Sequence, residues 1–538
     1  MRTQALLLAS VAVPLFGAAC FLLATLRPRP GWRLTAWVSP ACAALSLGAA
    51  IALAVVRSGH GPVTALGGLV RADSLSEFML IVIGAVGLLA TAASPAWLNA
   101  EIAARRASPR AAAKHSALVQ LFLAAMAAAV LTASLGLTWV AIEATTIVTA
   151  FLVGQRKTRQ AVEAAWKYVM ICSTGIALAL LGLLVLNAAA AHAGLPAGLD
   201  WTRLVAAAPH LNRGVTRIAV ALLLIGFGTK AGLAPLHAWL PDAHGQAPAP
   251  VSALMSGVLL SVAMYAILRV KVIADLALGT EYTRTLLLIL ALASLLLAAS
   301  LLISQRDYKR MLAYSSIEHM GLLALGAAAG SPLAVAAVLL HMLGHGLAKG
   351  SLFISAGRVL QLTGTHRIDR VSGLASRAPL LAGCLGLGIL ALLGFPPFSL
   401  FASELGIARA GFASGLGWVT TVALALVLVI AAMLLTHVSR MLLGPAPAAT
   451  EGGLAAGAAP PQAGTERAST ASVIQNGSVA TLAPPAIYAA ETAKPAAMFP
   501  DSGLLPVVVA LAACAVLGVY AGPVTTLLHA AAQAVVTP

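Results

Sequence analysis

Apolar runs long enough to cross a lipid bilayer recur along this whole chain. A membrane-spanning helix needs about 20 apolar residues, because the hydrocarbon core of a bilayer is about 30 Å thick. Of the 538 residues, 60% are hydrophobic and only 9% are charged, which excludes a water-soluble globule and a disordered chain. The runs are uninterrupted rather than alternating, so they indicate helices rather than barrel strands. We therefore predict an all-α polytopic membrane protein.

Fourteen windows of spanning length can be counted, and each predicts one transmembrane helix. The first window resembles a signal peptide, but its apolar run is long enough to span, so we interpret it as a retained first helix. The windows lie near 4–26, 34–56, 75–98, 115–135, 137–154, 166–190, 216–240, 249–271, 285–304, 311–329, 333–357, 379–408, 418–443 and 503–527.

The basic residues of the predicted loops indicate an orientation in the membrane. Of the 33 Lys and Arg residues, 21 fall in the odd-numbered loops and 9 in the even-numbered ones. Because Lys and Arg accumulate in cytoplasmic loops, we expect the odd loops in the cytoplasm and both termini outside. The same loop residues account for the net charge of +16, and no basic block interleaved with aromatic residues indicates nucleic-acid binding.

Four charged residues inside predicted helices stand out, namely Glu143, Lys230, Lys349 and Glu404. A charge at the bilayer centre costs about 2.5–3.5 kcal/mol on insertion scales, so each is a functional candidate. Lys349 ends a series with His341 and His345, and the four-residue spacing places all three on one helix face. The alternative for each charge is an ion pair that only fixes helix packing, and a histidine often does no more than satisfy a carbonyl group.

Two of these charges lie beside helix breaks. Lys230 precedes a break marked by Gly232 and Pro235, and Glu404 follows a break at 394–397 that contains two prolines. Broken helices 7 and 12 are five helices apart, as expected if helices 4–8 and 9–13 form two inverted five-helix repeats. Such paired interruptions are typical of a transport site near the bilayer midplane.

These features predict five parts of the chain. A stretch rich in Pro, Ala, Gly, Ser and Thr cannot build a core, so we interpret it as a flexible cytoplasmic linker. The predicted parts are a three-helix segment at 1–98, the first repeat at 115–271, the second repeat at 285–443, the linker at 445–502 and a C-terminal helix at 503–538.

Three stretches resemble the antiporter-like subunits of respiratory complex I and membrane-bound [NiFe] hydrogenases. They are KAGLAPLHAWLPDAHGQAPAPVSALMSGVLL, RDYKRMLAYSSIEHMGL and HMLGHGLAKGSLF. Within this family, SSIEHMG and LTWVAIEATTIVTAFLVG are most similar to hydrogenase-4 component F and its formate hydrogenlyase counterpart. The resemblance implies a fourteen-helix core in a bacterial plasma (inner) membrane, with a hydrated charged axis midway across the bilayer.

The resemblance also implies a proton relay through this axis. Glu143 matches the helix-five glutamate and Lys230 the lysine of the broken helix, while the remaining relay residues are His341, His345, Lys349 and Glu404. Some members carry a lysine in helix eight where this chain has Ser261, so the link between the halves is expected to use His319, the helix-eleven histidines or water.

A further trio lies near the connection between helices seven and eight. His237, Asp242 and His244 are candidates for proton uptake, and loop capping is the alternative role for them. The five cysteines are scattered and no GxGxxG or P-loop pattern occurs, so we expect no metal or redox cofactor in the chain itself.

The resulting hypothesis is a proton-translocating, non-redox subunit of a hydrogenase-4-like or complex I-like oxidoreductase complex. Its expected partners are other membrane subunits and a peripheral arm with nickel–iron and iron–sulfur subunits. Two alternatives stay open: a subunit of a multisubunit cation/proton antiporter, and a proton-driven membrane partner of an inorganic-carbon uptake module.

Overall fold

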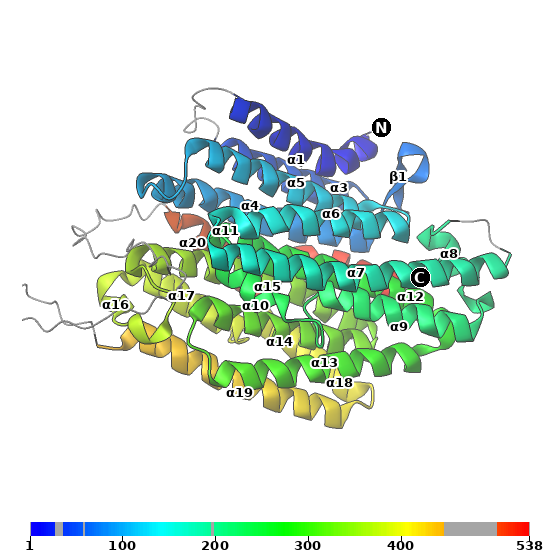
Figure 1. Cartoon of the computed structure of the whole chain (residues 1–538). Helices are drawn as coiled ribbons and strands as arrows, with labels where there is room; N and C mark the ends of the chain where they lie inside the picture. The colour runs from blue at the N-terminus through cyan, green and yellow to red at the C-terminus, as the bar shows by residue number, and fades with distance from the viewer. Residues whose placement is uncertain (1, 27–35, 58–59, 195–197, 446–502, 537–538) are drawn as a thin grey trace, which may run out of the picture.

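A computed structural model describes residues 2–26, 36–57, 60–194, 198–445 and 503–536. Long helices lie side by side in a bundle, with one short two-stranded hairpin (Figure 1). Within these described ranges, ten helices are long and apolar enough to cross a membrane, and one bent pair would make an eleventh. The all-α polytopic membrane class is therefore confirmed, whereas the count of fourteen crossings and the inverted repeats stay predictions.

Ten of the predicted windows coincide with single membrane-length helices. Four of these follow a polar residue whose side chain accepts a backbone N–H of the first turn, namely Asp73, Ser108, Thr158 and Ser331. The ten are α1 (Arg2–Leu26), α3 (Val38–Arg57), α4 (Ser74–Ala103), α5 (Pro109–Leu131), α6 (Leu135–Val153), α7 (Arg159–His192), the continuous α11 (Ala249–Leu254), η4 (Met255–Leu259) and α12 (Leu260–Leu278), α13 (Thr280–Ile303), α15 (Pro332–Thr363) and α19 (Gly417–Leu443).

The other four windows contain shorter, more polar or divided helices. They hold α9 (Arg213–Lys230) followed by α10 (Trp239–Gln246), α14 (Tyr308–Ala329), α17 (Pro379–Leu392) with α18 (Ser399–Ala413), and α20 (Leu505–Val519) with α21 (Gly522–Val536). The single helix predicted at 503–527 is thus two helices, bent by 75°. The Gly–Pro pair at 522–523 explains the division, because proline lacks the N–H that a continuing helix needs. The predicted linker lies outside the described residues except for position 445.

Both predicted helix breaks are present, and their backbones are alike. Each helix ends with a glycine in the left-handed region, with φ 76° at Gly232 and φ 64° at Gly394. After each glycine, the next N–H donates to the carbonyl five residues earlier, at 2.9 Å and 3.1 Å respectively. This is the Schellman arrangement, which favours glycine because other residues are strained at positive φ.

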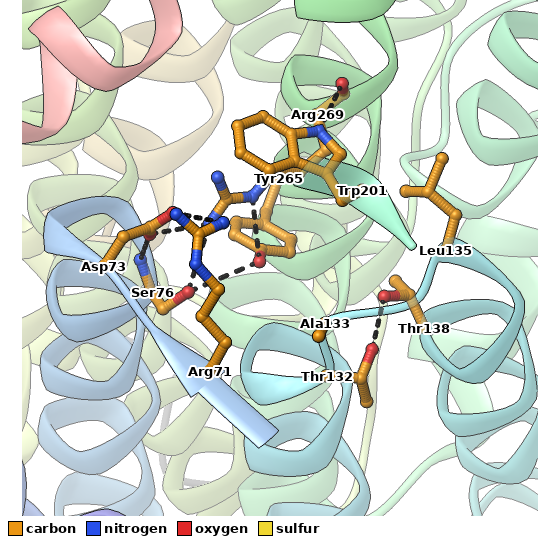
Figure 2. Close-up of a pocket in the computed structure, with 10 residues that line it drawn as sticks. All are labelled: Arg71, Asp73, Ser76, Thr132, Ala133, Leu135, Thr138, Trp201, Tyr265 and Arg269. Carbon is orange, nitrogen blue, oxygen red and sulfur yellow. Dashed lines mark hydrogen bonds and ion pairs between the residues drawn. The ribbon is translucent and has the colours of Figure 1, made fainter. Parts of the chain in front are cut away.

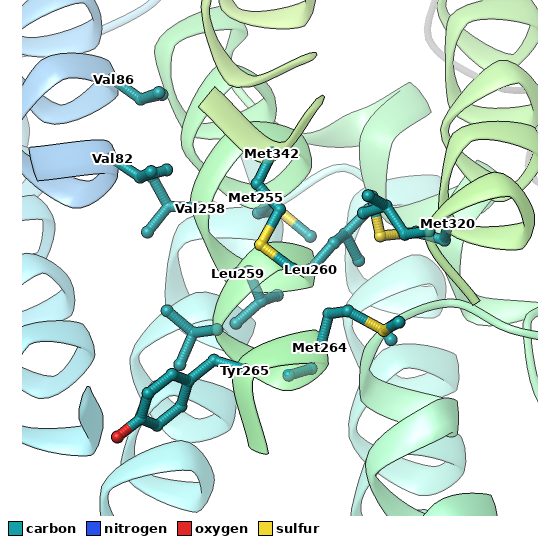
Figure 3. Packing of buried hydrophobic residues seen from close by; sticks show 14 of the residues in the cluster. Val82, Val86, Met255, Val258, Leu259, Leu260, Met264, Tyr265, Met320 and Met342 are labelled. Carbon is teal, nitrogen blue, oxygen red and sulfur yellow. The ribbon is translucent and has the colours of Figure 1, made fainter. Parts of the chain in front are cut away.

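The α11–η4–α12 segment lies at the centre of the bundle. Its spanning window is entirely buried, whereas most of the α19 window faces outward. Figure 3 shows apolar side chains gathered around η4 and the start of α12, among them Val86 of α4, Met320 of α14 and Met342 of α15. This densely packed segment contacts α9 through α12, and it contacts α15 through α11 and η4.

A polar cluster fastens α12 to α4 at one end of the bundle (Figure 2). Arg269 Nη2 donates to Asp73 at 2.6 Å, and Arg269 Nε donates to the hydroxyl of Tyr265 at 3.0 Å. The Trp201 ring lies 4.6 Å from the Arg269 guanidinium, within cation–π range.

Short elements connect the long helices. They are β1 (Val63–Ala65), η1 (Leu66–Gly68), β2 (Val70–Ala72), η2 (Gly154–Arg156), α8 (Trp201–Ala207), η3 (Ala208–His210), η5 (Ile368–Arg370) and α16 (Leu374–Arg377).

Candidate functional site

The first candidate cluster links Glu143 of α6 to Lys230, the last residue of α9, through a hydroxyl group. Lys230 Nζ donates to Oγ1 of Thr146 at 2.7 Å, and Thr146 Oγ1 donates to a carboxylate oxygen of Glu143 at 2.9 Å. Thr146 lies one turn after Glu143, so the two side chains share a helix face. A continuous hydrogen-bonded chain therefore joins the ammonium group to the carboxylate.

Two side chains of α7 complete this cluster. Tyr168 accepts a second hydrogen bond from Lys230 Nζ at 2.7 Å, and Ser173 donates to Glu143 at 3.2 Å. Lys230 and Tyr168 are fully buried, whereas Glu143 is partly exposed. The contact between α7 and α9 depends on small residues, since a methyl group at Gly226 would lie 2.6 Å from the α7 backbone.

The second candidate cluster contains three buried histidines from α14 and α15. His319 Nδ1 and His341 Nε2 lie 3.0 Å apart. The ring of His345 has its centroid 5.0 Å from that of His319. His341 and His345 are one turn apart on α15, so their four-residue spacing gives the shared face that the sequence predicts.

Lys349 and Glu404 flank this histidine cluster. The ammonium group of Lys349 donates to the carbonyl of Leu312 and to the hydroxyl of Ser315, both on α14. Glu404 of α18 packs against Gly394 at the second helix break. One Glu404 carboxylate oxygen also lies within 4.8 Å of ring nitrogens of His319 and His341. The second helix break thus places a carboxylate beside the imidazoles.

Glu318 is a buried charged residue that the sequence interpretation missed. It is 2% exposed, and its Oε2 has no hydrogen-bond partner among the residues described. Lys349 and Glu404 are its charged neighbours. The available signal was its position in the middle of the predicted 311–329 helix, where a carboxylate is as costly as the four charges singled out above.

The predicted uptake trio occupies three different environments. Asp242 accepts from Lys167 at 3.1 Å and from Arg310 at 2.8 Å, and it lines a polar cavity of about 340 Å³. His244 is buried and stacks on Phe353, with ring centroids 4.8 Å apart. His237 is half-buried, and its Nδ1 lies 3.1 Å from the carbonyl oxygen of Pro235. Of the three, Asp242 alone lines this cavity.

Ser261 lies in the segment between the two clusters. Its hydroxyl donates to the carbonyl of Gly257 on its own helix at 3.1 Å. One turn earlier, the hydroxyls of Ser256 and Ser316 are 2.9 Å apart and connect η4 to α14. Apolar side chains such as Met264 make up much of the surrounding wall (Figure 3). The Ser261 side chain is therefore turned toward its own backbone.

These features define an antiporter-like helical membrane protein, with titratable side chains buried beside two broken helices. Residues 132–431, more than half of the chain, match the family model described as NADH:quinone oxidoreductase/Mrp antiporter, TM. The chain belongs to this family, which confirms the predicted resemblance.

Relatives and solved structures agree with this assignment. The chain is 39% identical over 344 residues to the hydrogenase-4 component F homolog of Methylacidiphilum infernorum, covering 63% of this chain and 72% of that protein. It is 37% identical over 259 residues to the N subunit of the NADH-quinone oxidoreductase of Desulforudis audaxviator, covering 47% of this chain and half of that protein. A chain in the structure of the Mrp complex from Dietzia sp. has the same fold, with 23% identity and a TM-score of 0.80 over 100% of this chain and 98% of that chain.

Proposed function

We propose that this chain is a proton-translocating, non-redox membrane subunit of a hydrogenase-4-like or complex I-like oxidoreductase complex. The main support is Lys230, a fully buried lysine at a helix break that is hydrogen-bonded through Thr146 to Glu143. Interrupted helices beside buried charges are typical of transport sites. The similarity to a hydrogenase-4 component F homolog favours the hydrogenase-type complex.

The first step of the proposed relay is a proton shift across the Thr146 hydroxyl. An N–H proton of Lys230 moves to Oγ1 while the Oγ1 proton moves to Glu143, which leaves a neutral amine and a carboxylic acid. The reverse shift restores both charges. A partner subunit that perturbs either end would therefore move a proton along the chain.

The second half of the relay uses imidazole groups, which accept a proton at one nitrogen and release it from the other. His319, His341 and His345 carry the proton in this proposal, with Lys349 before them and Glu404 at the far end. Proton uptake would begin at the polar cavity beside Asp242, and it would involve the buried His244 and the half-buried His237.

The proposal includes a cellular setting. The chain would lie in a bacterial plasma membrane with both termini outside, and it would assemble with other membrane subunits and a redox arm containing nickel–iron and iron–sulfur subunits. It would carry no cofactor of its own. Purification of the tagged chain in mild detergent, followed by identification of the proteins that accompany it, tests this setting.

The decisive experiment separates proton transfer from helix packing. Lys230→Ala leaves Glu143 with an unbalanced charge, whereas Lys230→Met combined with Glu143→Leu replaces both charges by apolar groups, a change that buried pairs often tolerate. We expect the double variant to assemble and to translocate no protons, measured as proton uptake by inverted membrane vesicles. A double variant that assembles and still pumps would contradict the relay.

A second candidate function is a subunit of a cation/proton antiporter without electron transfer. The full-length similarity to a chain of an Mrp complex favours it, because that match covers the whole chain. Proteoliposomes containing the purified complex distinguish the two functions. Sodium-driven proton flux without any redox substrate supports the antiporter, and flux that requires a redox substrate supports the oxidoreductase complex.

A further inference from the structure

The histidine cluster between α14, α15 and α18 also has the composition of a metal site. Donor atoms of His319, His341 and Glu404 all lie within 4.8 Å of one another. Imidazole nitrogens and a carboxylate oxygen are a ligand set that suits Zn²⁺ and neighbouring divalent transition metals. We propose that these three side chains bind one divalent transition-metal ion.

The hydrogen bonds around His341 hold it in the orientation of a ligand. The hydroxyl of Ser403 donates to the carbonyl of Leu400 at 2.9 Å and lies 3.0 Å from Nδ1 of His341. Since the hydroxyl hydrogen is already used, Ser403 accepts the Nδ1–H, and the lone pair of His341 is on Nε2. Metal-bound histidines typically donate their second ring N–H to an oxygen in this way.

The spacing of the two nitrogens is close to that of a metal-bound pair. His319 Nδ1 and His341 Nε2 are 3.0 Å apart. Two ligands on a tetrahedral zinc ion, with bonds of about 2.0–2.1 Å, are separated by about 3.3 Å. His319 Nε2 has no partner in the described part of the chain, so the ring proton can move there when a metal takes Nδ1. Binding at His319 therefore needs a small displacement and no loss of a proton from the ring.

His345 is placed to supply a fourth ligand. Both of its ring nitrogens are buried, and within the described ranges neither has a hydrogen-bond partner. A buried polar atom without a partner is costly, and a bound ion would satisfy it. Its centroid is 5.0 Å from that of His319 and 6.3 Å from that of His341.

The charges around the cluster are compatible with a divalent cation. Glu404 supplies one carboxylate, and Glu318 supplies a second on α14 that faces the same region. Lys349 is the opposing charge, but its ammonium group is held by the carbonyl of Leu312 and by Ser315. Two acidic side chains and one basic side chain therefore lie beside the imidazoles.

A bound ion would occupy the nitrogens that the proposed relay uses, so it would act as a reversible inhibitor and not as a resident cofactor. Proton translocation should stop while the metal is present. The site itself goes beyond the proposed function and does not rest on it, because ligand binding requires only the geometry of the four side chains. Metal binding can be measured in detergent without any proton gradient.

The test is a Co²⁺ titration of the purified full chain, produced without a polyhistidine tag. Co²⁺ replaces Zn²⁺ in such sites and gives a visible ligand-field spectrum. We expect one Co²⁺ per chain, displaced by Zn²⁺, and loss of the spectrum in His341→Gln and in Glu404→Gln. The Ser403→Ala variant keeps every ligand and removes only the oxygen that orients His341, so its affinity should fall about ten- to a hundredfold.

The matched control is His115→Ala, which removes a buried histidine of α5 that is hydrogen-bonded to Gln155 at 2.8 Å. Its Co²⁺ spectrum and affinity should equal those of the unmodified chain. Absence of saturable one-to-one binding, or unchanged binding in His341→Gln and Ser403→Ala, would overturn the proposal. A chain that binds Co²⁺ but moves no protons after the metal has been removed would instead count against the proposed function alone.

Discussion

The two helix breaks have nearly the same backbone but different side chains. Two residues before the left-handed glycine, the first break has Lys230 and the second has Leu392. The charge at the second break is Glu404, which comes from the following helix and packs back against Gly394. The same turn therefore positions a cation in one part of the molecule and an anion in the other.

The groups beside the two breaks differ in the same way. The first cluster is a chain from an ammonium group through one hydroxyl to a carboxylate, in which each link has a fixed partner. The second has imidazoles, and several of their buried nitrogens have no partner in the described ranges. We infer that proton transfer in the first cluster depends on individual hydrogen bonds. In the second cluster, the imidazole nitrogens can exchange one hydrogen-bond partner for another.

The largest expected effect is that of Lys230→Arg at the first break. Arginine keeps the positive charge but cannot release its proton at any reachable pH, so translocation should be abolished although the complex assembles. Proton uptake by membrane vesicles measures this. The control is Lys114→Arg, at an exposed position of α5, which should leave uptake unchanged. Normal pumping by Lys230→Arg would mean that this lysine only provides a charge.

A smaller effect is expected from Thr146→Val, which removes the linking hydroxyl and keeps the side-chain shape. A hydrogen bond to a charged group contributes about 1.5–3 kcal/mol, so translocation should fall about tenfold or more, and Thr146→Ser should restore it. Thr145→Val is the matched control, because the Thr145 hydroxyl is buried and donates only to the carbonyl of Ile142. Equal losses in both valine variants would show that the effect arises from helix packing.

The sequence predicts the breaks better than it predicts their surroundings. Glycine and proline act on their own backbone, so Gly232 and Gly394 could be recognised from local chemistry alone. Thr146 could not, because a threonine inside a helix usually bonds a carbonyl of its own turn. Its role as a link depends on where α9 ends relative to α6. The long helices could also be predicted from local sequence, because a run of about 20 apolar residues indicates a spanning helix whatever it packs against.

Glu318 and His244 show the limit of pattern reasoning. Glu318 stands in an apolar run, but its importance depends on Lys349 and Glu404, which lie in distant parts of the sequence. His244 is only two residues from Asp242 in sequence, yet its ring stacks on Phe353 of α15. Neighbours in sequence can thus be separated by packing that no local spacing encodes.

A third prediction concerns stability rather than translocation, at the polar cluster that joins α12 to α4. Burial would raise the pKa of Asp73, but the Arg269 guanidinium and the Ser76 N–H hold that pKa below its ordinary value. Such a carboxylate stabilises the fold above the unfolded-state pKa of about 3.9, and this contribution is lost as the pH falls through the folded-state pKa. The protein should therefore lose stability as the pH falls below about 5.

Asp73→Asn should remove part of this pH dependence and lower the stability at neutral pH by about 3–5 kcal/mol, since Arg269 keeps a buried charge without its carboxylate. Thermal unfolding in detergent at several pH values measures both effects. Asp369→Asn is the control, because its ion pair with Arg367 is exposed and should contribute little. Unchanged acid sensitivity in Asp73→Asn would assign the pH dependence to other carboxylates.

The smallest effect is expected from Ser261→Ala, between the two clusters. The Ser261 hydroxyl donates to Gly257 on its own helix, so its removal breaks no contact between helices and should leave both translocation and stability nearly unchanged. Ser256→Ala is the matched comparison: it removes the link to Ser316 and should lower the melting temperature more than Ser261→Ala does. Proton uptake and thermal unfolding of both variants decide this. A tenfold loss of uptake in Ser261→Ala would show that this hydroxyl carries protons between the clusters. The apolar side chains around η4 and α12 would then not isolate one cluster from the other.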